Sequence, residues 1–125
     1  MSLYKKWKKK GTMNFEIETT EYFKDNFKRL SKKYHSLIDD LKKFKDKLLK
    51  NPEMGADLGY NTRKVRMAIA SKNKGKRGGA RVITCTVLID VTNSEIYLLA
   101  IYDKGEKESI SKKDIIELKK MAGLL

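Results

Sequence analysis

The sequence predicts an α+β fold in a single domain of 125 residues. Its hydrophobic pattern has period two over residues 14–19, helical spacing over residues 21–50, and period two again over residues 64–70, followed by two apolar runs at 82–89 and 96–102. Ser111 with Asp114 then forms a capping signal for a final helix. We therefore expect an N-terminal strand and two helices, then a three-strand antiparallel meander that completes one sheet, and a C-terminal helix.

The N-terminal half alternates and then turns helical. Apolar or Thr side chains at every second position of residues 14–19 predict a strand with one buried face. Thr20 is placed to cap the first helix, and Ser36 with Asp39 resembles a capping box for the second. Pro52 disfavours continuation of that helix. The two apolar stripes comprise Phe23, Phe27, Leu30, Tyr34, Leu37, Leu41, Phe44 and Leu48.

The second half contains the remaining strands. After a loop that extends to about Tyr60, alternation over residues 64–70 predicts a strand. Residues 82–89 and 96–102 are mostly apolar or Thr on both faces, which is typical of interior strands covered on two sides. Residues 91–94 are expected to join them as a hairpin turn.

The net charge of +13 is concentrated in two segments. Five lysines lie in residues 1–12, a basic leader that we expect to be disordered or non-native. Eight basic residues and no acidic one lie in residues 61–81, so the rest of the chain is neutral. A local cationic face favours a phosphate-backbone ligand, because fixed positive charge releases condensed counterions. The charge pattern therefore indicates a nucleic-acid partner.

The cysteine content and the apolar runs bear on location. Cys85 is the only cysteine, which excludes an intrachain disulfide and favours a reducing, cytoplasmic compartment. We expect it to be a small buried side chain rather than a reactive thiol. No signal-peptide apolar run follows the leader, and the longest apolar run, residues 96–102, is too short to span a membrane. We expect no membrane partner.

The basic segment gives a specific geometric expectation. Lys64 and Arg66 point to the same side of their strand, about 7 Å apart. Arg81 opens the next strand and returns to the same patch if the intervening loop makes a hairpin. Glycines in that loop permit positive φ or close approach to a ligand, but their spacing does not match the G-x-x-x-x-G-K-[ST] phosphate loop. The loop adds the basic residues Lys72, Lys74, Lys76 and Arg77.

Several of these features have plainer interpretations. A basic run is often a solvated, mobile hairpin tip, although the missing acidic residues and the strand-borne pair favour a binding surface here. Tyr102 is either a core residue or a base-stacking surface. His35, the only histidine, lies between two helices and is expected to be structural or exposed. One His and one Cys cannot build a metal site, and carboxylates do not cluster at ligand spacing, so we expect no metal and no cofactor.

Three segments together resemble a known family. Arg63-Lys64-Val65-Arg66, the KGKRGGARVI segment of residues 74–83, and the YLLAIYDK segment of residues 97–104 resemble the RelE/HigB-like toxins of bacterial type II toxin-antitoxin systems. The resemblance covers Met13 to the C-terminus and implies a RelE-like, microbial-ribonuclease-like fold. It also implies an mRNA interferase that enters the ribosomal A site, contacts ribosomal RNA and cleaves translated mRNA, together with a cognate antitoxin that neutralises it.

The resemblance also implies site residues. Lys64 and Arg66 match the family's paired basic strand positions, and Arg81 matches the arginine that opens the following strand, so these three are the predicted catalytic residues. Lys104 matches a basic position just after the last strand. The predicted RNA-binding residues are Arg63, Lys72, Lys74, Lys76, Arg77, Tyr102, Lys104 and Lys107.

Several positions depart from the family pattern, among them Thr84 and Cys85, which stand where this branch often carries aromatic residues. Gly105 stands about where several relatives carry a second catalytic arginine, and Ile110 or Ser111 stands where some carry a catalytic tyrosine. Lys107 is a candidate replacement for the missing charge if its loop bends toward the patch.

The predicted reaction is attack by a ribose 2′-OH on the adjacent phosphate, which gives a 2′,3′-cyclic phosphate and a free 5′-OH without a metal. Fixed cations stabilise the charge that develops on the phosphorane. Lys64 is the candidate general base, and Arg66 and Arg81 are expected to hold the phosphate. Two alternatives remain: a ParE-like toxin, which shares the fold but acts on DNA gyrase, and a non-catalytic RNA-binding module.

Overall fold

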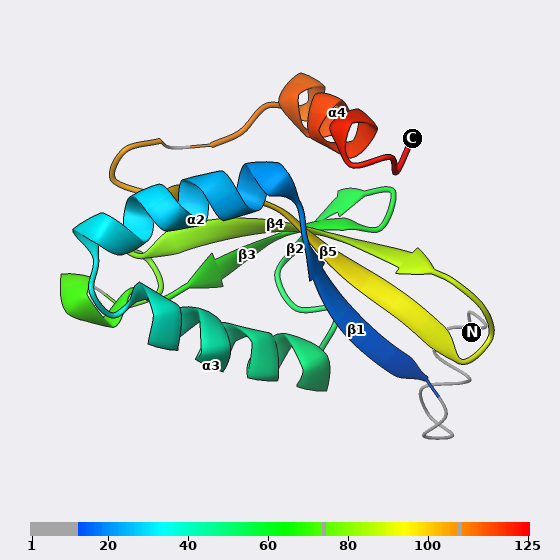
Figure 1. Ribbon diagram of the computed structural model, residues 1–125, viewed down its shortest axis with the longest axis horizontal. Helices are drawn as coiled ribbons and strands as arrows, with labels where there is room; N and C mark the ends of the chain where they lie inside the picture. Colours follow the sequence, from blue (N-terminus) through cyan, green and yellow to red (C-terminus); the bar gives the residue numbers. More distant parts are fainter. Residues whose placement is uncertain (1–12, 74, 108) are drawn as a thin grey trace.

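The computed structural model describes residues 13–73, 75–107 and 109–125, so the predicted basic leader, residues 1–12, lies outside the described residues. One five-stranded sheet has the order β1-β5-β4-β3-β2, with β1 parallel to β5 and the other neighbours antiparallel (Figure 1). The predicted α+β class is confirmed. The elements are β1 (Asn14–Thr19), α2 (Glu21–Lys33), α3 (Leu37–Lys50), β2 (Ala56–Gly59), β3 (Thr62–Met67), the 3₁₀ helix η1 (Ala70–Lys72), β4 (Ala80–Leu88), β5 (Asn93–Asp103) and α4 (Lys112–Met121).

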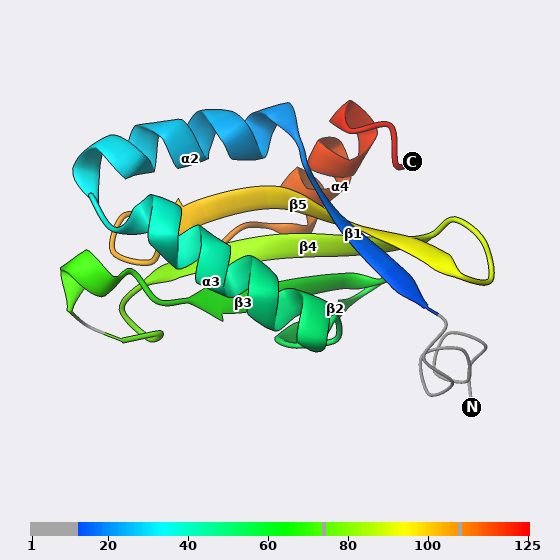
Figure 2. The ribbon, with the colours of Figure 1, turned by 60° about the horizontal axis from the view of Figure 1, so that its bottom comes forward.

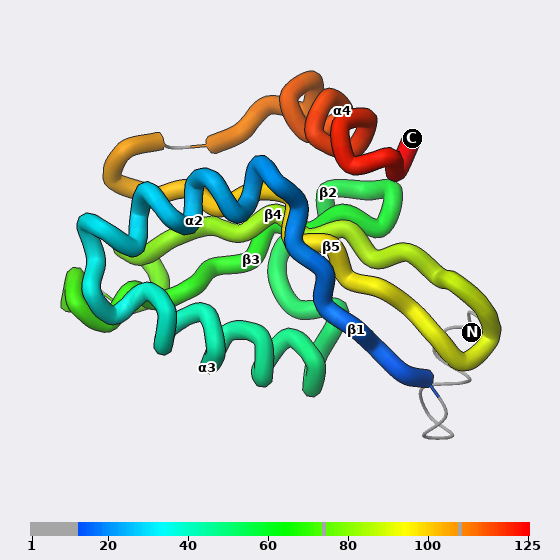
Figure 3. Tube along the Cα trace, in the orientation of Figure 1, coloured from blue at the N-terminus to red at the C-terminus, as the bar shows by residue number. Residues whose placement is uncertain are grey.

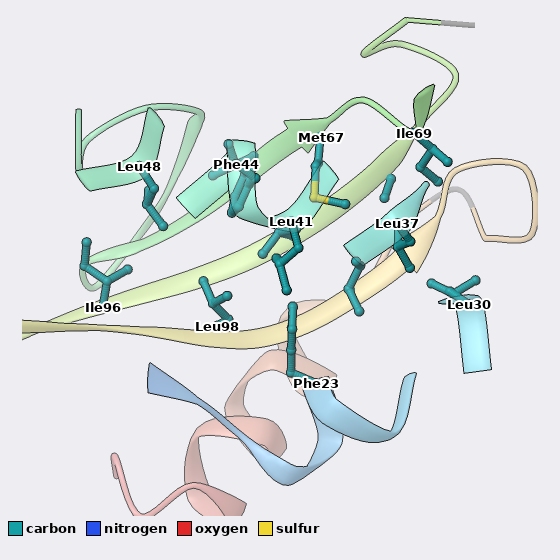
Figure 4. Close-up of a cluster of buried hydrophobic side chains, with 14 residues drawn as sticks. Phe23, Leu30, Leu37, Leu41, Phe44, Leu48, Met67, Ile69, Ile96 and Leu98 are labelled. Atoms are coloured by element: carbon teal, nitrogen blue, oxygen red, sulfur yellow. The ribbon is translucent and has the colours of Figure 1, made fainter. Parts of the chain in front are cut away.

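Helices cover both faces of the sheet (Figures 1 and 2). The larger core joins the apolar stripes of α2 and α3 to one face of β3, β4 and β5, and its side chains interdigitate in Figure 4. The smaller core packs α4 against the opposite face, through Ile115 and Leu118. β4 and β5 are interior strands, as predicted, and Cys85 is a buried member of the smaller core. Among the described residues, none of the helices combines the length and apolar character that a membrane crossing requires.

Two predicted helix caps are confirmed and one is wrong. The Thr20 hydroxyl accepts a hydrogen bond from the backbone amide of Phe23, and the Ser111 hydroxyl accepts one from the amide of Asp114, as N-cap side chains do. Ser36 precedes α3 but makes no capping bond. Its hydroxyl instead donates to the buried carboxylate of Asp40 at 2.7 Å, and its oxygen accepts from the Ser71 amide at 2.9 Å. The Ser36 side chain is therefore used to attach η1 to the start of α3.

The strand boundaries differ from the expectations in three places. β2 lies inside the segment predicted as a loop, and it is joined to β3 by a two-residue turn whose residues, Tyr60 and Asn61, have positive φ of 52° and 59°. A type I′ hairpin turn requires both of its central residues to be in the left-handed region, as these two are. β3 ends at Met67, so Ile69 leaves the predicted strand and precedes η1. The predicted turn at 91–94 lies two residues earlier, at 89–92, because β4 ends at Leu88 and β5 begins at Asn93.

A β-bulge in β5 sets the direction of the side chains that follow it. Ile83 pairs with Ala100 and Thr84 with Leu98, so Leu99 is an extra residue without a partner in β4. Leu99 and Ala100 consequently both face the smaller core, and the alternation is reversed from there on. Tyr102 therefore faces the α4 side of the sheet, and Asp103 faces the α2–α3 side.

Asp103 is a buried carboxylate that joins three segments. It accepts hydrogen bonds from Lys72 Nζ at 2.8 Å, from the Tyr34 hydroxyl at the end of α2, and from the Gly105 amide at 2.9 Å. Only 1% of its side chain is exposed. Burial alone would raise the pKa of Asp103, but the bonds from Lys72, Tyr34 and Gly105 hold it at about 2.

We expect Asp103→Asn to destabilise the fold at neutral pH and to remove part of its acid sensitivity. Because the pKa of Asp103 is lowered on folding from 3.8 to about 2, its contribution to the free energy of unfolding is fully present above pH 3.8 and is lost as the pH falls toward 2. That contribution is about 2 kcal/mol at pH 7. Urea denaturation at pH 7 and at pH 3 measures it. Asp46→Asn, at an exposed position of α3, is the control, and equal loss of stability at both positions would contradict this role.

Candidate functional site

A hollow of about 440 Å³ lies where β3, β4 and β5 meet their connecting loops. We call it the cationic hollow, because no lining residue among the described ones is acidic. Its neutral lining comes from Met54, Gly55, Ala56 and Val65, and sequence reasoning missed the first three because they lie just before and at the start of the unpredicted strand β2. The five cations that line it are Lys64, Arg66, Lys76, Arg81 and Lys104.

The alternation of β3 aims two of these cations. Val65 and Met67 are buried in the larger core under α2 and α3, so Lys64 and Arg66 point to the opposite face. Arg66 pairs in register with Arg81 on β4. The structure thus brings Lys64, Arg66 and Arg81 to one hollow, and their catalytic roles stay predictions. Within the described part of the chain, Lys64, Arg66 and Lys76 form no ion pair.

Arg81 is the most deeply buried of the five cations, with only 6% of the residue exposed. Its Nη1 donates to the carbonyls of Lys76 at 3.1 Å and Ala80 at 3.2 Å, and its Nη2 donates to the carbonyl of Arg77 at 3.0 Å. Three of the five N–H groups of the guanidinium are therefore engaged, two by the loop and one by Ala80 at the start of β4, and two are left for a ligand. Arg81 fixes the backbone that carries Lys76 as well as adding its own charge.

The two loops that border the cationic hollow are joined to each other. A Cβ on Gly79 would lie 2.2 Å from the Met67 carbonyl, so only glycine permits this close approach to the end of β3. The Lys104 amide donates to the Gly79 carbonyl at 3.1 Å. We expected the loop glycines to approach a ligand or to adopt positive φ; Gly75 has φ of +63°, whereas Gly79 approaches the protein's own backbone.

Two residues predicted to bind RNA are placed elsewhere. Lys72 is mostly buried, pairs with Asp103 and lies 5.6 Å from the Tyr34 ring centre, so its ammonium group is committed to the fold. Arg63 points to the face opposite Lys64, and its guanidinium donates to the Gly55 carbonyl at 3.3 Å. Alternation along β3 explains the placement of Arg63, and no local pattern could have predicted the partner of Lys72.

The other predicted basic residues have mixed outcomes. Lys76 and Lys104 line the cationic hollow, and Arg77 is exposed on the loop beside it. Lys74 lies outside the described residues. Lys107 lines a separate hollow against α2, because Arg29 and Lys33 of that helix hold the neighbouring Glu106 at 3.0 and 3.3 Å. The bend that would bring Lys107 into the cationic hollow is therefore absent from this structure.

Tyr102 is a core residue rather than a stacking surface. Only 6% of it is exposed and it belongs to the smaller core, so it offers little surface on which a base could stack, although it lines the hollow that Lys107 also lines. Its hydroxyl has no hydrogen-bond partner among the described residues. His35, which we expected to be structural or exposed, is exposed.

Carboxylates do come together at the other end of β5, contrary to the expectation from spacing alone. The oxygens of Glu16, Glu18 and Glu95 lie within 4.8 Å of one another, because β1 pairs with β5 in parallel register. Tyr97 donates its hydroxyl to Glu95 at 2.9 Å, which contributes to the raised pKa of Tyr97. This acidic cluster is mostly exposed and shares no residue with the cationic hollow.

The chain was compared with known protein families. The family described as the RelE toxin of the RelE/RelB toxin-antitoxin system matches residues 19–125, which include every described residue of the cationic hollow.

We expect Arg81→Ala to loosen the loop that carries Lys76. The substitution removes three hydrogen bonds to backbone carbonyls, so the amides of Gly79 and Lys104 should exchange their hydrogens at least about tenfold faster. Arg77→Ala removes the same charge from an exposed side chain and keeps its carbonyl, and it should leave both exchange rates unchanged. Unaltered exchange in Arg81→Ala would show that Arg81 does not hold the loop.

Proposed function

The chain belongs to the RelE toxin family, whose members are toxins of toxin-antitoxin systems with an antitoxin partner, and we propose that it is an endoribonuclease that binds the phosphate of mRNA in the cationic hollow. One observation carries this proposal: five cations from two strands and two loops line one hollow that has no acidic lining residue among those described. Such a concentration of fixed charge favours a polyanionic backbone.

The proposed reaction is metal-free transfer within the RNA. The ribose 2′-oxygen attacks phosphorus and loses its proton, the bond from phosphorus to the 5′-oxygen breaks, and that oxygen takes up a proton. The products are a 2′,3′-cyclic phosphate and a free 5′-OH. Lys64 is the proposed base, and Arg66 with the two free N–H groups of Arg81 holds the non-bridging oxygens.

Preorganisation supports the proposed reaction. β3 holds Lys64 and Arg66 on a strand anchored by buried Val65 and Met67, and Arg81 is held by its loop bonds. Cations that are fixed before the reaction need no reorganisation when charge develops, and each such donor contributes roughly 10²–10³ in rate in comparable electrostatic sites. We propose that the substrate is translated mRNA in the ribosomal A site in the cytoplasm, so that cleavage inhibits translation.

One observation favours the non-catalytic RNA-binding module as a second candidate. Three N–H groups of Arg81 are already bonded to backbone carbonyls, which reduces its capacity to stabilise a phosphorane while leaving the charge of the cationic hollow intact. Binding without cleavage would then inhibit translation by occupancy alone.

We expect mRNA in a cell-free translation reaction to be cleaved within A-site codons, as mapped by primer extension on stalled ribosomes. Lys64→Ala and Arg66→Ala should each slow this cleavage by roughly 10²-fold or more, because each removes a preorganised cation. Lys28→Ala removes the same kind of charge from an exposed position of α2 and should cleave at the wild-type rate.

The outcomes of this mapping separate the candidates. Stalled ribosomes on intact mRNA would favour the RNA-binding module. Intact mRNA with altered DNA supercoiling would favour the ParE-like, gyrase-directed alternative. Equal cleavage by the Lys64, Arg66 and Lys28 variants would place the reaction outside the cationic hollow.

The affinity for single-stranded RNA should fall steeply with salt. If all five cations of the cationic hollow neutralise phosphates, the log-log slope of the association constant against salt is about −3 to −4. Arg66→Ala should make this slope less negative by roughly 0.7. Fluorescence titration with an uncleavable 2′-deoxy strand measures both, and a slope near zero would exclude electrostatic binding.

A further inference from the structure

Tyr102 does not itself line the cationic hollow: it lines the separate hollow against α2, next to a residue that lines the cationic one, and the proposed reaction gives it no role. Arg66, Arg81 and Tyr102 form one row across β3, β4 and β5, because each pairs in register with the next. The bulge at Leu99 turns Tyr102 to the face that Arg81 occupies. The phenol is therefore the immediate cross-strand neighbour of a guanidinium that lines the hollow.

The Tyr102 hydroxyl is unusual because it is buried and unpaired. Its oxygen has less than 1 Å² of accessible area and no hydrogen-bond partner among the described residues. Tyr97, on the same strand, donates to Glu95 at 2.9 Å, and Tyr34 donates to Asp103. A buried hydroxyl without a partner destabilises the free protein, and a ligand that supplies an acceptor would remove this cost.

The chemistry of the surroundings limits what that partner is. Burial raises the pKa of Tyr102, against the opposing effect of Arg81, so the phenol stays protonated and has a hydrogen to donate. The charged side chains that line the cationic hollow are Lys and Arg, which are donors without acceptor capacity. The hollow that Tyr102 lines also contains Asp103 and Glu106, but these carboxylates accept from Lys72 and Arg29 and make no bond to the phenol. An oxyanion that enters the hollow supplies the missing acceptor.

We propose that Tyr102 donates its hydroxyl hydrogen to a non-bridging oxygen of the phosphate bound in the cationic hollow, an inference that rests on the proposed function. The hydroxyl is covered in the free protein, so the phosphate reaches it when Arg81 exchanges loop carbonyls for phosphate oxygens. Tyr102 then contacts the substrate from β5, a position different from Ile110 and Ser111.

The test compares two identical substitutions on one strand. Tyr102→Phe removes only an unpaired hydroxyl, so its urea midpoint should equal or exceed that of the wild type, while single-turnover cleavage of ribosome-bound mRNA should be roughly 10- to 100-fold slower. Tyr97→Phe removes a hydroxyl bonded to Glu95 and should cleave at the wild-type rate with an equal or lower midpoint. An uncleavable RNA should also raise the melting temperature of Tyr102→Phe less than that of the wild type.

Three results would overturn the inference. If the wild type cleaves and Tyr102→Phe cleaves equally fast, Tyr102 does not contact the phosphate and the proposed function stands. If Tyr102→Phe loses both stability and activity, the hydroxyl has a structural role. If the wild type itself leaves mRNA intact, the proposed function fails, and the role of Tyr102 fails with it.

Discussion

The buried carboxylate of Asp103 is the interaction on which the arrangement around the cationic hollow depends. Five cations close together repel one another, and two of the segments that carry them are loops. Asp103 binds the turn after β5 through the Gly105 amide, η1 through Lys72 and the end of α2 through Tyr34. Asp103 lies on the face of the sheet that α2 and α3 cover, so it anchors the borders of the hollow without neutralising the charge inside it. A negative charge on the other face would oppose phosphate binding.

Arg81 illustrates how a side chain can serve the fold and the site together. Its bonds to the Lys76 and Arg77 carbonyls hold the loop at the start of β4, and Gly79 permits this arrangement by packing against the Met67 carbonyl. The loop runs away from the sheet at the end where the segment after β5 turns back toward α4 (Figure 3). The guanidinium is thus held in place by backbone acceptors, which carry no formal charge and leave its positive charge unneutralised.

Much of the fold could be predicted because its elements follow simple periods. Thr20 and Ser111 cap helices that show clear apolar stripes, and alternation alone placed Lys64 and Arg66 on one face. β2 was not predicted, because a four-residue strand next to a Tyr60-Asn61 turn has neither the length nor the Asn-Gly signal of a hairpin. The pairing of Lys72 with Asp103 and the use of Ser36 to attach η1 depend on contacts between distant segments, for which residue spacing gives no signal.

The extra residue at Leu99 has a consequence for how this chain tolerates insertions and deletions. Because Leu99 and Ala100 face the same side, removing Leu99 would restore strict alternation and leave Tyr102 and Asp103 on the faces that they occupy now. A one-residue deletion after Ala100 would instead shift the pairing by one, so that Asp103 would lie opposite Arg81 on the face of the cationic hollow. The chain therefore tolerates a change of length at the bulge, whereas the same change just beyond it would place a carboxylate beside Arg81 and break the bonds of Asp103 to Lys72 and Tyr34.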